Sequence, residues 1–265
     1  MLDRLRLRPR RPTVAVLRLH GMISSGPRGP LSDEALGPVI ERAFRKGKPD
    51  AVALSLNSPG GSPVQSSLIA ARIRRLSEEK KVPVYAFVED VAASGGYWLA
   101  CAADEIHADE SSIVGSIGVI SAGFGAQVFL SRQGLERRVH TAGKSKSMLD
   151  PFRPEDPADV ERLEGLLGDI HTAFIDHVKR RRADRLKPAV PLFEGDVWLG
   201  RRAEELGLID GLGHLVPVMK GKFGDKTRFR RYGPRRGIFS RLGGAMIGDA
   251  VAGIEERAAF ARFGL

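Results

Sequence analysis

Residues 51–62 read AVALSLNSPGGS, and this stretch decides the fold. Ala51–Leu56 is mostly apolar, which is typical of a buried β-strand. The strand runs into Asn57–Ser62, a turn that only a glycine-rich sequence tolerates. A helix is expected next, carrying Leu68, Ala71, Ile73 and Leu76 up to a charged stop at Glu78–Lys81.

The flanking sequence repeats this alternation. Strands are expected at Val14–Leu19 and Val82–Val88, a helix at Leu31–Lys46 with Ser32 as its N-cap, and a helix of small residues from about Ser94. Strand, helix, strand, helix predicts an α/β fold: a parallel sheet with helices on its faces. Farther along, the sequence predicts a helix at Gln127–Gly134, a strand at Arg137–Thr141 and a long helix at Glu155–Ala183. Helical spacing in the long helix is kept by Val160, Leu163, Leu167, Ile170, Phe174 and Val178.

The formal charge of +10 is concentrated near the ends, at Arg4–Arg11 and Lys220–Arg241. The N-terminal run Arg4–Arg11 contains no aromatic residue that could stack on bases, and we expect no nucleic-acid partner. The single cysteine, Cys101, lies in a small-residue run; it excludes an internal disulfide and is expected to be packing. Ile238–Leu265 could form an amphipathic helix, as a packing or oligomer face or as a membrane contact.

Two segments carry residue types that folding alone does not require. Consecutive glycines in Asn57–Ser62 leave backbone N–H groups free to point at a ligand, although a plain strand-to-helix turn would look the same. In Asp90–Trp98, Ser94 stands between small residues at a helix start. That position exposes its hydroxyl above the positive end of a helix dipole, and the alternative there is a simple N-cap.

These segments, taken with others in order, resemble the signal peptide peptidase family of serine proteases, which share the fold of Clp protease and crotonase. The matching pieces are Asn57–Gly61, Ala93–Tyr97, Gly115–Ile120, Ala142–Lys146, and Phe193–Gly195 through Gly207–Asp210. The resemblance covers roughly residues 13 to 215. It implies a Clp protease/crotonase-like parallel sheet built from ββα repeats, with a basic extension at 1–12, a peptidase domain at 13–218 and a basic, partly helical extension at 219–265.

The resemblance also implies the chemistry. Ser94 would be the nucleophile and Lys146, as a neutral amine, its general base, with Lys144 as the rival lysine. Ser116 would support the amine, and N–H groups of Gly61 and Gly95 would form the oxyanion hole. A desolvated pocket can supply the ~4 kcal/mol that a drop of ~3 units in a lysine pKa requires. No cofactor is implied, and the substrates would be peptides or unfolded segments with small or apolar residues, such as remnant signal peptides.

The same residues bear on alternative functions and on the expected location of the protein in the cell. A Ser/His mechanism would need one of the histidines at positions 20, 107, 140, 171, 177 and 214, none of which lies in a catalytic motif, and no metal-ligand spacing occurs. A crotonase-like acyl-CoA hydratase or isomerase would need carboxylates, and Glu89 and Asp90 are the acids nearest Ser94. An inactive, membrane-associated scaffold is the third alternative. We expect a homo-oligomer in the cytoplasm without a transmembrane segment, in peripheral contact with an anionic inner leaflet through the N-terminal arginines.

Overall fold

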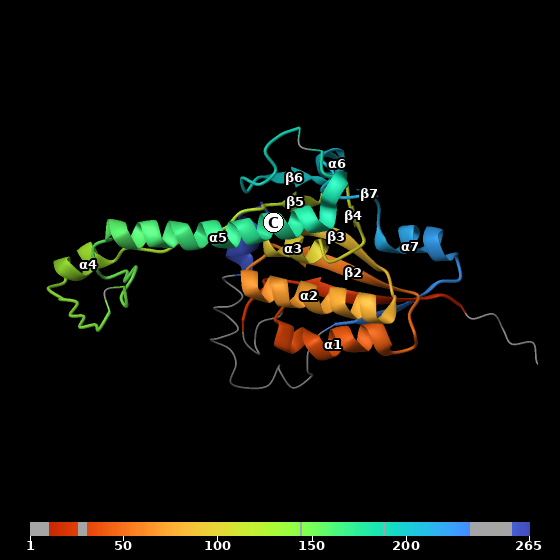
Figure 1. Ribbon diagram of the computed structural model, residues 1–265, viewed down its shortest axis with the longest axis horizontal. Coiled ribbons are helices and arrows are strands. Elements are labelled where there is room, and N and C mark those ends of the chain that lie inside the picture. Colours follow the sequence, from red (N-terminus) through yellow and green to blue (C-terminus); the bar gives the residue numbers. More distant parts are fainter. Residues whose placement is uncertain (1–10, 26–30, 144, 188, 234–255) are drawn as a thin grey trace, which may run out of the picture.

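The computed structural model describes residues 11–25, 31–143, 145–187, 189–233 and 256–265. A sheet of eight strands forms its centre, in the order β6-β5-β3-β2-β1-β8, with β4 and β7 branching from β3 (Figure 1). The strands are β1 Thr13–His20, β2 Ala51–Ser58, β3 Val84–Ala93, β4 Glu105–Ala108, β5 Ile113–Gly115, β6 Val197–Leu199, β7 Gly211–Leu212 and β8 Arg228–Tyr232. Among the ladders of the described strands, only β5–β6 is antiparallel. The predicted parallel sheet is confirmed.

The helices follow the expected alternation. They are α1 Asp33–Arg45, α2 Pro63–Lys80, α3 Gly95–Ala100, α4 Gln127–Arg132, α5 Pro157–Arg182, α6 Gly200–Glu205 and α7 Leu215–Phe223, with a 3-10 turn at Ala183–Arg185. Ser32 is the N-cap of α1, as predicted, because its Oγ accepts a hydrogen bond from the Ala35 N–H at 3.2 Å. Leu68 differs from expectation, because it is 46% exposed, whereas Ile73 and Leu76 of the same predicted spacing are buried, together with Ile69.

The two faces of the sheet bury separate apolar clusters. One face packs Leu17, Leu54 and Ala86 under α1, α2, α3 and the end of α5. The other face packs Val16, Ala53 and Phe87 against Met219 of α7. Since β8 pairs with β1, the sheet continues past the boundary predicted at residue 218.

The two halves of strand β3 pair with different strands, and this arrangement positions the functional site. Its first half, Tyr85–Val88, pairs with β4, whereas Val91–Ala93 pairs with β5. The carboxyl ends of β3 and β5 therefore lie side by side, with Ala93 opposite Gly115. Each strand leads directly into a serine, Ser94 and Ser116.

Residues 133–143 and 145–156, together with α4 and the first half of α5, form an arm, which Figure 1 shows extending away from the sheet. The predicted strand at residues 137–141 is wrong, since these residues are mostly exposed and adopt neither strand nor helix. The apolar stripe of α5 is only partly covered: Phe174 and Val178 are buried, whereas Val160 and Leu163 on the arm are half-buried.

Two other expectations concern the ends of the chain. Most of the predicted amphipathic tail, residues 234–255, and most of the basic N-terminal extension lie outside the described residues. Within the described tail, residues 256–261 are helical. No helix in the described ranges is long and apolar enough to cross a membrane.

Candidate active site

Ser94 lies in a strained turn between β3 and α3. Its φ of 51° and ψ of −124° are rarely adopted by a residue with a side chain, and such strain gathers at functional sites. The Ser94 N–H donates to the Gly115 carbonyl at 2.8 Å, and the Ser94 carbonyl accepts from the N–H groups of Tyr97 and Trp98. These backbone bonds hold the turn, while the side chain makes no capping hydrogen bond. The hydroxyl is therefore left to face the adjoining cavity.

Two glycines bring the end of β2 against this turn. A Cβ on Gly60 would stand 2.8 Å from both the Ser94 Cβ and the Gly95 nitrogen, so only glycine fits there. Gly61 has a φ of 138° and forms a bridge with Ile23, in which Ser62 rather than Gly61 donates its N–H.

The N–H groups of Gly61 and Gly95 are both available for a ligand. Within the described residues the Gly61 N–H donates to no acceptor, and the N–H of Gly95 lies in the first turn of α3, where helices leave donors free. Both residues line the cavity that Ser94 lines. Two free donors beside a serine hydroxyl are the parts from which an oxyanion hole is made.

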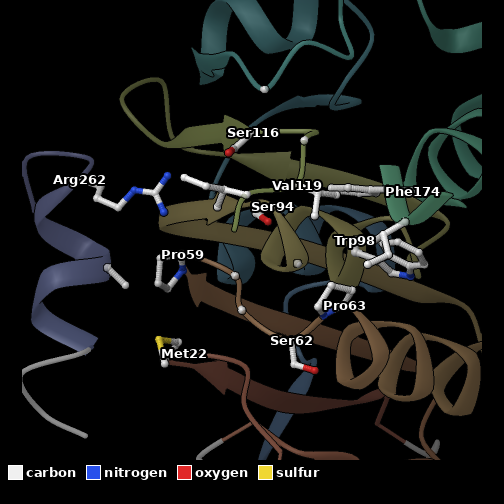
Figure 2. A pocket seen from close by; sticks show the side chains of 18 of the residues that line it. Met22, Pro59, Ser62, Pro63, Ser94, Trp98, Ser116, Val119, Phe174 and Arg262 are labelled. Atoms are coloured by element: carbon white, nitrogen blue, oxygen red, sulfur yellow. The ribbon is translucent and has the colours of Figure 1, made fainter. Parts of the chain in front are cut away.

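The cavity has a volume of about 490 Å³ and collects residues from most of the chain (Figure 2). It is lined by Met22, Pro59, Gly60, Gly61, Ser62, Pro63, Ser94, Gly95, Trp98, Ser116, Gly118, Val119, Ile120, Ile170, Phe174, Glu194, Gly195, Ala259, Arg262 and Phe263. Most of these side chains are apolar or absent. The cavity thus suits an extended peptide with an apolar side chain better than a highly charged ligand.

Trp98 forms an aromatic wall of the cavity that is fixed from behind. Its ring stacks on Phe174 at 4.9 Å and on His177 at 4.7 Å between centroids. The His177 Nε2 lies 3.2 Å from the Trp98 carbonyl oxygen. Burial lowers the pKa of His177 to about 4, so the ring is neutral at physiological pH. A neutral ring can pack against the tryptophan without leaving a buried charge.

Ser116 repeats the geometry of Ser94 on the neighbouring strand. It follows β5 with a φ of 51°, and its N–H donates to the Asp196 carbonyl at 2.6 Å. Figure 2 shows both serines on the same cavity, which the lining also records.

Lys146 lies elsewhere. It is exposed, it belongs to the arm, and its N–H donates to the Gly143 carbonyl at 3.2 Å. It does not line the cavity of Ser94, and Figure 1 shows its segment at the far end of α5. Of the predicted site residues, Ser94, Ser116, Gly61 and Gly95 meet at one cavity, whereas a single chain leaves Lys146 outside it. Lys144 lies outside the described residues.

The histidines are placed away from Ser94. None of them, all of which fall in described segments, lines the cavity. The His171 Nε2 lies 3.1 Å from the Ile117 carbonyl oxygen, and His140 is exposed on the arm. A Ser/His pair within one chain therefore has no support in the geometry.

The other residues that the sequence singled out do not face this cavity either. Burial raises the pKa of the Cys101 thiol to about 12, which leaves it unreactive, so its predicted packing role holds. Glu89 accepts a hydrogen bond from the Ser55 hydroxyl at 2.6 Å, and Asp90 accepts one from the Asn57 amide. Neither acid lines the cavity, as a crotonase-like reaction would require. The described residues hold no cluster of three side chains suited to a metal ion.

Several residues of the cavity were not predicted from the sequence. Phe174 and Ile170 were expected on the apolar stripe of the long helix, but nothing in their spacing indicated that they line a site. Met22 carries no local signal, and Val119 was expected only as part of the matching piece Gly115–Ile120. Ala259, Arg262 and Phe263 lie at the other end of the chain, and only the tertiary fold brings them to Ser94.

A comparison with known proteins identifies the family. A family model described as peptidase family S49 matches residues 77–222, more than half of the chain. The chain belongs to peptidase family S49. The match includes Ser94, Ser116 and Lys146, so the predicted resemblance to signal peptide peptidases is confirmed at the level of the family.

Relatives within the family differ in length and setting. The chain is 33% identical to the chloroplastic serine protease SPPA of Arabidopsis thaliana over 77% of this chain and 31% of that protein. It is 32% identical to a putative protease of Synechocystis over 77% of this chain and 70% of that protein. A protein of Brucella melitensis named as an Na(+)/H(+) antiporter NhaA is 48% identical over 98% of this chain, yet the chain spans only 39% of it. The antiporter name therefore belongs to a protein of which this chain matches a part.

Solved structures share the fold. The 1510-N membrane-bound stomatin-specific protease, solved as a mutant with a substrate peptide, aligns with a TM-score of 0.54 at 14% identity, over 92% of this chain and 98% of that one. A second mutant of the same protease also gives a TM-score of 0.54, at 16% identity, over 85% of this chain and all of the other. The expected Clp protease/crotonase-like fold is thereby confirmed.

Proposed function

We propose that the chain is a serine endopeptidase that uses Ser94 as nucleophile and Lys146 as general base. The observation that carries the proposal is the strained Ser94 turn, which turns an unbonded hydroxyl toward a cavity that the free N–H groups of Gly61 and Gly95 also line. Membership of peptidase family S49 supports peptide hydrolysis as the reaction.

The reaction proceeds in two stages. The Lys146 Nζ takes the proton from the Ser94 Oγ, which attacks the scissile carbonyl carbon. The carbonyl oxygen becomes negative and accepts hydrogen bonds from the glycine N–H groups, an arrangement in which each donor is worth about 3 kcal/mol in the transition state. The ammonium of Lys146 returns the proton to the leaving amine, and an acyl ester on Ser94 remains. Water, deprotonated by the same amine, then hydrolyses the ester.

Lys146 reaches Ser94 in this proposal from a second copy of the chain. The arm that carries Lys146 exposes large apolar side chains, including Val128 at 61% and Phe129 at 64% exposure. A surface of this kind marks a protein interface. Packing of the arm on a neighbouring copy would cover these side chains and bring Lys146 to the cavity of that copy.

Assembly into an oligomer would also provide the apolar surroundings that a lysine base needs. A lysine acts as a base only as the neutral amine, which burial in an apolar contact favours over the ammonium form. Lys146 is exposed in the single chain, so the active base would form only on oligomerisation. Ser116, on the same cavity as Ser94, would hold the amine in place through its hydroxyl.

The substrates would be peptides or unfolded segments, such as remnant signal peptides. The wall formed by Trp98 and Phe174 can accept an apolar side chain next to the scissile bond. We place the enzyme in the cytoplasm, with its basic N-terminal arginines against an anionic membrane surface. Cell fractionation with a salt wash tests this setting, because protein that stays soluble at every ionic strength would contradict it.

Peptidase assays on matched variants test the reaction. We expect Ser94→Ala and Lys146→Ala each to lower kcat/KM by about 1,000-fold or more, whereas Ser111→Ala, an exposed serine outside the cavity, keeps full activity. Activity retained in Lys146→Ala and lost in Lys144→Ala would assign the base to the rival lysine. Hydrolysis of acyl-CoA instead of peptides would indicate the crotonase-like reaction, and activity in neither assay would favour a scaffold.

A further inference from the structure

The cavity of Ser94 is closed on one side by the far end of the chain. Ala259, Arg262 and Phe263, from the helical segment 256–261 and the turn after it, line the same cavity as Ser94. Figure 2 shows the Arg262 side chain reaching from this segment toward the cavity. The chain thus places a guanidinium beside its candidate nucleophile.

The charge of Arg262 distinguishes it from most side chains that line the cavity. Among the described residues that line the cavity, only Arg262 and Glu194 carry a charge. Arg262 forms no ion pair and no hydrogen bond with any residue in the described part of the chain, Glu194 included. Other arginines packed into the fold do have acid partners, such as Arg72 with Asp33 and Arg182 with Asp210. An unpaired guanidinium in a substrate cavity is available for an anionic group of the ligand.

The positions of the residues around the cavity indicate where on the substrate such an anionic group would lie. Figure 2 shows Ser94 between Arg262 on one side and the Trp98 and Phe174 rings on the other. A peptide with an apolar side chain against these rings would cross Ser94 and continue toward Arg262. The guanidinium would then meet a group on the opposite side of the scissile bond from the apolar residue.

We infer that Arg262 is a specificity residue that binds a substrate carboxylate. A guanidinium pairs with a carboxylate through two parallel hydrogen bonds, which gives a directional preference that a lysine does not match. The carboxylate is that of an acidic side chain or that of the peptide C-terminus. The inference rests on the proposed peptidase function, because it assigns the anionic group to a peptide that crosses Ser94.

Peptides that differ only in charge test the inference. One series carries Glu, Gln or Lys at successive positions on each side of the cleaved bond, and a second ends in a free carboxylate or an amide close to that bond. The first series detects an acidic side chain as the ligand, and the second detects the peptide terminus. With the wild-type protein we expect kcat/KM to be about tenfold higher for the carboxylate form of one series.

Variants assign this preference to the arginine. Arg262→Glu should reverse the preference, and Arg262→Lys should weaken it. Arg257→Glu, a charge reversal on an exposed residue of the preceding helix that does not line the cavity, should leave the preference unchanged. A preference that survives Arg262→Glu overturns the inference. So does an equal rise in activity on every peptide after deletion of residues 256–265, because the segment would then act only as a cover.

A binding measurement separates this inference from the proposed function. Fluorescence anisotropy with the Ser94→Ala protein reports binding of the same labelled peptides without any cleavage. Carboxylate-dependent binding that Arg262→Glu abolishes supports the inference even if the wild-type protein cleaves none of the peptides. Equal binding of the carboxylate, amide, Gln and Lys forms overturns it, even if the protein is an active peptidase.

Discussion

Ser94 and Ser116 share a positive backbone φ of 51°, and each directly follows one of two adjacent strands. The N–H of Ser94 donates to the carbonyl of Gly115, the residue before Ser116, so the two turns are joined by a hydrogen bond. A pair of strained serines at one cavity is costly for a protein that only has to fold. Their relationship links the candidate nucleophile to the residue proposed to position its base.

Ser116→Ala tests this positioning role. Loss of the hydroxyl should leave the amine of Lys146 free to move, and misplacement of a catalytic group by about 1 Å can cost about 100-fold in rate. We expect kcat to fall by about 10- to 100-fold with little change in KM, as measured with a fluorogenic peptide. Wild-type kcat in Ser116→Ala would remove Ser116 from the site.

Gly60→Ala should damage the Ser94 turn. The added Cβ would lie 2.8 Å from the Ala93 carbonyl oxygen and the Ser94 Cβ, in a residue whose φ is 102°. Backbone strain of this kind costs about 1 to 3 kcal/mol, so denaturant unfolding should show a loss of that size together with lower activity. Gly125→Ala is the control, because its Cβ would meet nothing within 4 Å. Equal stability of the two variants would contradict the observed packing.

Arg182→Leu should destabilise the whole fold. Arg182 is 1% exposed, and its guanidinium donates to the Gly207 carbonyl and to both carboxylate oxygens of Asp210. Despite its burial, Asp210 has a lowered pKa because Arg182 and the Ile106 N–H donate to it. Removal of one partner of a buried pair typically costs about 3 to 5 kcal/mol, which chemical denaturation can measure. Arg180→Leu, an exposed position on the same helix, should cost little.

His177 should make the stability of the protein fall in acid. Its pKa is about 4 in the folded state and 6.5 when unperturbed, so the unfolded chain binds the proton more tightly. The stabilisation is therefore complete above pH 6.5 and is lost as the pH falls toward 4, by about 3 kcal/mol. Denaturation of wild type and His177→Phe at pH 7 and pH 4.5 measures this, and the variant should lose less stability than wild type. Equal losses would show that His177 does not titrate in this way.

Much of the sheet and its helices could be predicted from the sequence, because both depend on local signals. The apolar strand at Ala51–Leu56, the Ser32 cap and the glycines before α2 each fix a short piece of backbone on their own. Alternation of these pieces leaves few topologies for a parallel sheet. The Ser94 turn could also be predicted, since small residues on both sides of a serine after a strand have few other uses.

The predictions that were wrong or missing concern residues whose structure depends on contacts between distant segments. Residues 137–141 have the composition of a strand, but no neighbouring strand lies on the arm to pair with them. Helical spacing of Leu163 and Phe174 predicts one apolar face, yet only Phe174 reaches the body of the protein, so the face is buried at one end and half-buried on the arm. Arg262 carries no signal in the sequence, because only the fold brings residue 262 to Ser94.

Mixed assembly measures the central claim most directly. Ser94→Ala and Lys146→Ala chains, each inactive alone, are co-expressed and purified as one oligomer. A lysine supplied by the neighbouring copy should restore about a quarter of wild-type peptidase activity, since one site in four would combine an intact serine with an intact lysine. A double variant mixed with Ser94→Ala should restore none. Failure of the mixed oligomer to cleave peptides, when wild type does so, would contradict the claim that Lys146 acts on Ser94 of another copy.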